Sequence, residues 1–91
     1  MSIDSSDLRK IQKAYEKVKD AKIPIKMYSD EDFSDQNICD LVRIMRAQLN
    51  EVEKNPQLEK EYETRGTNWQ NLYDILMHLA DMRPVDLTNI Q

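Results

Sequence analysis

Only four residues of this chain break a helix by themselves, and they divide the sequence into a few long stretches. One glycine and three prolines stand among 91 residues, of which 40% are hydrophobic and 33% charged. A β fold of this size needs many tight turns, so this scarcity favours long solvated helices. The four breakers are Pro24, Pro56, Gly66 and Pro84. Because the chain is too short for two independent cores, we expect one all-α domain over residues 1–91.

The first expected helix covers residues 5–22. The acidic cluster at residues 4–7 supplies N-cap residues and first-turn carboxylates, and Pro24 disfavours helical angles at Ile23. Its apolar residues share one face at helical spacing: Leu8, Ile11, Tyr15 and Val18. Residues 23–28 then alternate apolar and polar side chains, which predicts a short extended segment. It is either a strand or an apolar-anchored loop, and we favour the loop because isolated strand pairs are marginal in water.

The second expected helix covers residues 35–54, with Ser34 as its N-cap. One face carries a heptad-like apolar pattern across four turns. Its members are Ile38, Leu41, Val42, Met45, Leu49 and Val52. Ile44 falls outside this face, so we expect it to contact a neighbour or a partner molecule.

The third and fourth expected helices cover residues 56–65 and 68–82. Asn55 caps the third helix at Pro56, and Gly66 is expected to end it in the left-handed conformation. Thr67 then caps the fourth helix in a capping box completed by Gln70. Beyond about residue 84 we expect a flexible tail. The consistent architecture is a compact bundle of about four helices.

The residue inventory gives no metal or cofactor site. Asp30, Asp32 and Ser34 alternate as in a calcium-binding EF-hand loop, but Asp35 stands where that loop needs glycine, and Leu41 where it needs glutamate. One cysteine and one histidine cannot supply a usual zinc site, and one glycine cannot form a phosphate-binding loop. We therefore expect no metal and no cofactor.

Catalytic groups are equally hard to assemble. Cys39 is expected at the flank of the core, where a half-buried structural role suits it, since nearby carboxylates oppose a reactive thiolate. His78 shares a stripe with Asp74 and Asp81 opposite Trp69, so we expect it to face water. With no nucleophile beside a base, the chain is predicted to be non-enzymatic.

Charge is divided unevenly along the chain, whose formal net charge is −4. Residues 1–28 carry seven basic and four acidic side chains, whereas residues 29–91 carry six and thirteen. Such asymmetry can steer a charged partner. The candidate partner-binding residues are a basic ridge on the first helix, Lys10, Lys13 and Lys17; an acidic turn, Asp30, Glu31, Asp32 and Asp35; and Ile44.

These features predict a protein-interaction module, such as an adaptor, an inhibitor, or an immunity or antitoxin protein. The expected partner is another protein with a basic surface, and self-association is left open. The alternative is a nucleic-acid-binding regulator with a helix-turn-helix-like element at residues 56–82, which the acidic C-terminal portion disfavours because it repels phosphate. The lone Cys39 and the lack of a signal peptide or membrane span predict a cytoplasmic protein.

Overall fold

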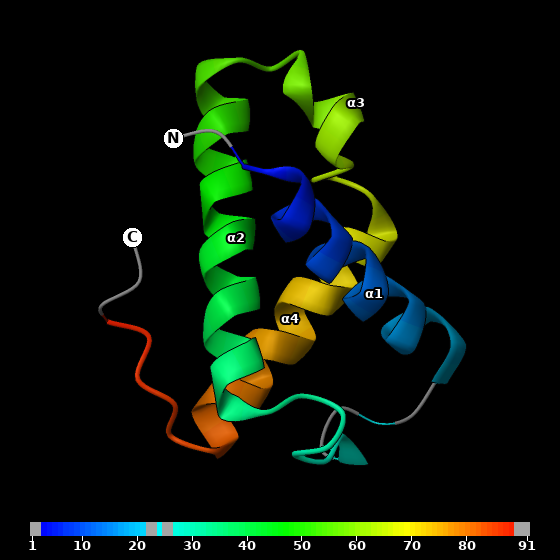
Figure 1. Cartoon of the computed structure of the whole chain (residues 1–91), viewed down its shortest axis with the longest axis vertical. Helices are drawn as coiled ribbons and strands as arrows, with labels where there is room; N and C mark the ends of the chain where they lie inside the picture. The colour runs from blue at the N-terminus through cyan, green and yellow to red at the C-terminus, as the bar shows by residue number, and fades with distance from the viewer. Residues whose placement is uncertain (1–2, 22–23, 25–26, 89–91) are drawn as a thin grey trace.

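The computed structural model of the chain describes residues 3–21, 24 and 27–88, and these ranges contain four helices and no strand (Figure 1). The helices are α1 (Ser5–Ala21), α2 (Asp35–Lys54), α3 (Leu58–Tyr62) and α4 (Thr67–Met82). The predicted all-α fold of four helices is therefore confirmed. α2 is the central element, because each of the other three helices packs against it, and α1 also packs against α4.

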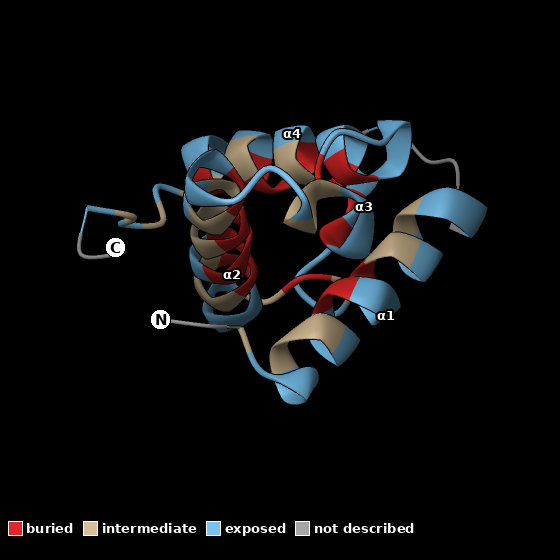
Figure 2. Ribbon diagram, turned by 90° about the horizontal axis from the view of Figure 1, so that it is seen from above, coloured by how far each residue is buried: buried red, intermediate tan, exposed pale blue. Residues whose placement is uncertain are grey.

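The core lies where the inner faces of α1, α2 and α4 meet, as the buried residues in Figure 2 show. The predicted apolar face of α2 is buried apart from Leu49, which is half-buried. α1 contributes Ile11 and Ala14 to the core, and Tyr15 and Val18 pack at its edge. Ser34 caps α2 as expected, since its side chain accepts a hydrogen bond from the Asn37 amide at 3.2 Å. Helical periodicity thus identified the buried faces correctly.

Of the two alternatives expected for Ile44, contact with a neighbour is the one that the structure shows, and its place on the partner-binding surface is wrong. Its side chain is 0% exposed, and Gln48, one turn further along α2, is only 1% exposed. Gln48 is tolerated there because its side-chain oxygen accepts a hydrogen bond from the Trp69 indole at 2.8 Å. The reason for the error is that α2 has three neighbouring helices, so its buried arc is wider than a single apolar stripe.

The connection between α3 and α4 also differs from the prediction. α3 ends at Tyr62, and the left-handed residue that follows is Glu63 (φ 53°, ψ 33°) rather than Gly66 (φ −73°, ψ 156°). Gly66 is the N-cap of α4, and Thr67 is the first helical residue, so the predicted capping box does not form. The chain reverses early because Tyr62 is fixed on α2. Its buried ring ends in a hydroxyl that donates to Glu51 at 2.5 Å, a bond that raises the pKa of Tyr62 to about 12.

The segment between α1 and α2 and the segment after α4 complete the fold. Half of the predicted extended segment at residues 23–28 lies outside the described residues; in the described half, the Met27 amide donates to the Pro24 carbonyl at 2.9 Å. After α4 the chain returns beside α2 (Figure 1), where Val85 and Leu87 pack against the core. The predicted tail is therefore packed at least through Leu87, and Cys39 lies next to it, its sulfur 4.0 Å from the Asp86 carbonyl oxygen.

The left-handed conformation of Glu63 predicts that Glu63→Gly stabilises the protein. Glycine adopts this conformation without a Cβ clash, so we expect the free energy of unfolding to rise by about 0.5–1 kcal/mol. Urea denaturation checks this. The matched control is Glu61→Gly inside α3, which should lower stability by about the same amount because glycine is a poor helix former. A loss of stability in Glu63→Gly would contradict the assigned end of α3.

Candidate partner-binding site

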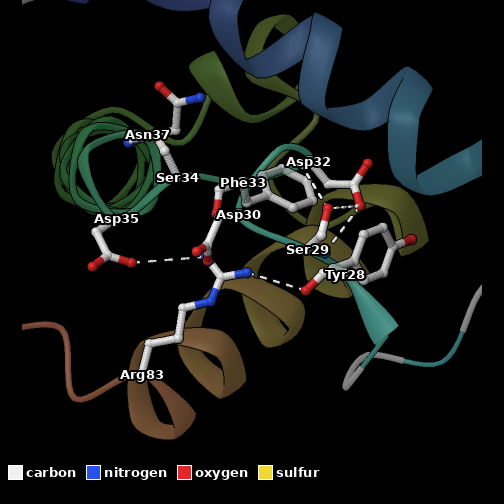
Figure 3. Close-up of polar contacts among 9 residues, drawn as sticks. All are labelled: Tyr28, Ser29, Asp30, Asp32, Phe33, Ser34, Asp35, Asn37 and Arg83. Atoms are coloured by element: carbon white, nitrogen blue, oxygen red, sulfur yellow. Dashed lines mark hydrogen bonds and ion pairs between the residues drawn. The ribbon is translucent and has the colours of Figure 1, made fainter.

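The acidic turn is held in place by Arg83, which follows the last residue of α4. One terminal nitrogen of its guanidinium lies 3.2 Å from the Asp30 carboxylate and 3.8 Å from that of Asp35, and donates to the Phe33 carbonyl. The other donates to the Tyr28 carbonyl at 3.1 Å (Figure 3). The Arg83 side chain is only 17% exposed, so its bonds to the two carbonyls are partly shielded from water, whereas the side chains of Asp30 and Asp35 are 85% and 67% exposed. Arg83 therefore ties both ends of the turn to α4.

Asp32 lies between Asp30 and Asp35 in the chain but has a different set of contacts. Its carboxylate accepts hydrogen bonds from the Ser29 amide and the Ser29 hydroxyl, both at 3.0 Å (Figure 3). These two hydrogen bonds hold the pKa of Asp32 below its ordinary value of 3.8, because they stabilise the ionised carboxylate. The nearby charge of Lys17 lowers this pKa further, to a smaller extent. The ionised carboxylate of Asp32 therefore stabilises the turn through its two hydrogen bonds with Ser29.

The basic ridge meets the acidic turn across a groove of about 280 Å³. Lys17 joins the two sides, since its ammonium donates to the Asp32 carbonyl at 2.8 Å and lies 5.4 Å from the centre of the Phe33 ring. Between the rims lie three buried apolar residues, Ala14, Phe33 and Leu41. The rims are Lys10, Lys13 and Lys17 on α1, and Asp32, Asn37 and Asp40 opposite. The structure therefore brings the predicted basic ridge together with one member of the predicted acidic turn, Asp32, whereas Asp30, Glu31 and Asp35 do not line the groove.

The charges around the groove are not equally satisfied. Asp32 accepts its bonds from Ser29, and Asp40 accepts one from the Gln36 side chain at 3.2 Å. Lys10 and Lys13 are exposed, and neither has an ion pair or a side-chain hydrogen bond within the described part of the chain. Among the charged groups of the groove, these two ammonium groups therefore keep their hydrogen-bonding capacity for a ligand, as does the exposed side-chain amide of Asn37.

Sequence reasoning missed three residues of this site: Arg83, Asn37 and Asp40. Asn37 and Asp40 follow from helix geometry, because they lie on the first turns of α2 beside Leu41. A signal for Arg83 was also present, since it is a cation at a helix C-terminus in an otherwise acidic part of the chain. Its pairing with residues some 50 positions earlier, however, depends on the tertiary fold.

Other candidate residues lie away from the groove. His78 is exposed on α4, as predicted, and Cys39 is half-buried beside the C-terminal segment. Among residues 3–21, 24 and 27–88, no three His, Cys, Asp or Glu side chains gather in a way that could hold a metal ion. None of the helices in these ranges has the length and apolar character needed to cross a membrane.

The helix-turn-helix arrangement considered from the sequence does not form. α3 has only five residues, and it packs against α2 without a close backbone approach to α4. A helix-turn-helix needs its two helices packed against each other so that the second can enter the major groove.

Comparison of the chain with protein-family models, with curated proteins and with solved structures gives no match.

Replacing Arg83 tests its structural role. Arg83→Ala removes two bonds to backbone carbonyls in a shielded site, and we expect the free energy of unfolding to fall by about 2–3 kcal/mol. Arg83→Lys should recover only part of this, because one ammonium cannot reproduce the planar fork. The controls Asp30→Ala and Asp35→Ala should each cost less than about 1 kcal/mol, because these carboxylates are 85% and 67% exposed. Equal losses in all variants, measured by urea denaturation, would contradict this assignment.

Asp32 predicts a specific dependence of stability on pH. Because its pKa is lowered by folding, its contribution is present at neutral pH and is lost as the pH falls below about 3.8, where the carboxylate of the unfolded chain takes up a proton more readily. The difference in stability between the native chain and Asp32→Asn should therefore shrink as the pH falls from about 4 toward about 2, the span below the unfolded pKa. In the control Glu31→Gln, an exposed neighbour, the difference should stay small throughout. If the difference in stability between the native chain and Asp32→Asn does not depend on pH, the ionised carboxylate of Asp32 does not stabilise the fold.

Proposed function

We propose that this chain is a non-enzymatic protein-interaction module that binds a partner protein in the groove between α1 and the start of α2. The observation that carries the proposal is the arrangement of the groove, in which an apolar floor lies between a row of lysines and a row of polar and acidic side chains. Protein interfaces share this anatomy of an apolar centre with a polar rim. We further infer that the module acts in the cytoplasm, where a lone free cysteine such as Cys39 is kept reduced.

The size of the groove supports a protein ligand. Pockets for small molecules usually have about 300–1,000 Å³ and enclose most of the ligand. This groove has about 280 Å³, just below that range, so it suits one or two side chains projecting from a larger partner. A module of this kind acts by occluding its partner or by joining it to another protein.

The chemistry of the groove supports a binding role over catalysis. Its described lining consists of lysine, aspartate, asparagine, alanine, leucine and phenylalanine side chains. Such a lining offers no serine, cysteine or histidine to act as a nucleophile or as a base near neutral pH.

Photo-crosslinking in cells of the source organism tests the proposal. A benzophenone amino acid placed at Asn37 lies in the groove, and the same amino acid placed at His78 lies on the exposed side of α4. We expect a discrete crosslinked protein from the Asn37 position and none from the His78 position. An excess of unlabelled native chain should suppress the product, whereas excess Lys10→Glu/Lys13→Glu chain should not. Absence of an Asn37-specific product, with both labelled chains folded by circular dichroism, would remove the proposal.

A further inference from the structure

We infer that the ligand of the groove is an acidic protein segment that presents one apolar side chain to the floor. This inference rests on the proposed function and names the chemistry of the partner. It also reverses the sign expected from the sequence, where the acidic turn was matched to a basic partner.

Three of the four acidic side chains of the turn already have internal donors, and the fourth, Glu31, is exposed but does not line the groove. Asp30 and Asp35 both pair with Arg83, and the carboxylate of Asp32 accepts two bonds from Ser29. Asp32 is the member of the turn that lines the groove, so a cationic ligand bound there would have to compete with Ser29 for its carboxylate.

The lysine rim, in contrast, is available to an anionic partner. Lys10 and Lys13 project from adjacent turns of α1 on the groove side, so two carboxylates of an extended or helical segment can meet both ammonium groups. Lys17 is not free in this way, because its ammonium is held by the Asp32 carbonyl. The acid-binding part of the site is therefore Lys10 and Lys13.

The floor supplies the second element of recognition. Phe33 and Leu41 are 2% and 6% exposed, so each offers only its outer edge, and together with Ala14 they line the bottom of the groove. One inserted apolar side chain would remove this edge from water and exclude water from the ammonium–carboxylate pairs above it. Such exclusion strengthens charge pairs that contribute little on an open surface.

The groove is also built before any ligand arrives. Lys17 fixes α1 to the turn, Arg83 fixes the turn to α4, and Ser34 caps α2 beside Asn37. Because these contacts already order the residues around the groove, little conformational entropy is lost on binding. This favours recognition of a short segment.

Selection from a random library of displayed 12-residue peptides tests the inference without assuming a partner. The native chain is the bait, and peptides that also bind the support without the chain are removed. We expect the enriched peptides to share several Asp or Glu residues around one large apolar residue. In titrations of an enriched peptide, Lys10→Glu/Lys13→Glu should weaken binding at least tenfold, whereas Lys19→Glu/Lys60→Glu, which changes the net charge equally away from the groove, should leave affinity within twofold. Added salt should also weaken binding.

Four results would overturn the inference. They are an absence of enriched peptides, enrichment of basic or neutral sequences, equal binding by the two double variants, and nuclear magnetic resonance shift changes that lie away from Lys10, Ala14 and Asn37. A gel shift with single-stranded DNA or RNA at low salt, lost in Lys10→Glu/Lys13→Glu, would assign the lysine rim to nucleic acid instead. If an Asn37-specific crosslinked partner is found but its contacting segment is basic, the proposed function stands and only the acidic-partner inference fails.

Discussion

The guanidinium of Arg83 reaches from the end of α4 into a space that is mostly closed to water, and its donors have to find acceptors there. A guanidinium cannot release its proton, so burial without partners would be costly. The acceptors are two backbone carbonyls, of Tyr28 and Phe33, and the carboxylates of Asp30 and Asp35. These contacts fix a segment without regular secondary structure against two helices. The position of residues 28–35 therefore depends on one side chain some 50 residues away in the sequence.

The groove is a consequence of that arrangement. With the turn tied to α4, the ring of Phe33 enters the core, packing edge-on to Tyr28 with 5.5 Å between the ring centres. The opposite side of the turn then faces α1, where Lys17 binds the Asp32 carbonyl. Two segments with opposite charge are thus held apart by a fixed distance and over an apolar floor. A surface of this kind is built by backbone contacts more than by attraction between its charges.

Helix positions and buried faces could be predicted from the sequence because they depend on neighbours three or four residues apart. Ser34 was identifiable as a cap, and the apolar stripe of α2 was identifiable by its spacing. Ile44 could not be placed, because its burial depends on how many helices surround α2. The left-handed residue after α3 was misassigned to Gly66, since glycine preference was the only local signal. The fixed position of Tyr62 on α2, a tertiary contact, moved that residue to Glu63.

The candidate site shows the same division between local and tertiary information. The basic ridge and the acidic turn could both be identified from the sequence. A count of charges, however, does not distinguish a carboxylate with internal donors from one without them. In the folded chain, the availability of each charged group to a ligand depends on the groups that it already contacts. Asp30, Asp32 and Asp35 each have internal donors, whereas Lys10 and Lys13 remain exposed without such partners among the described residues. The proposal of an acidic partner therefore follows from the local charge of the groove and not from the net charge of the chain, which is −4.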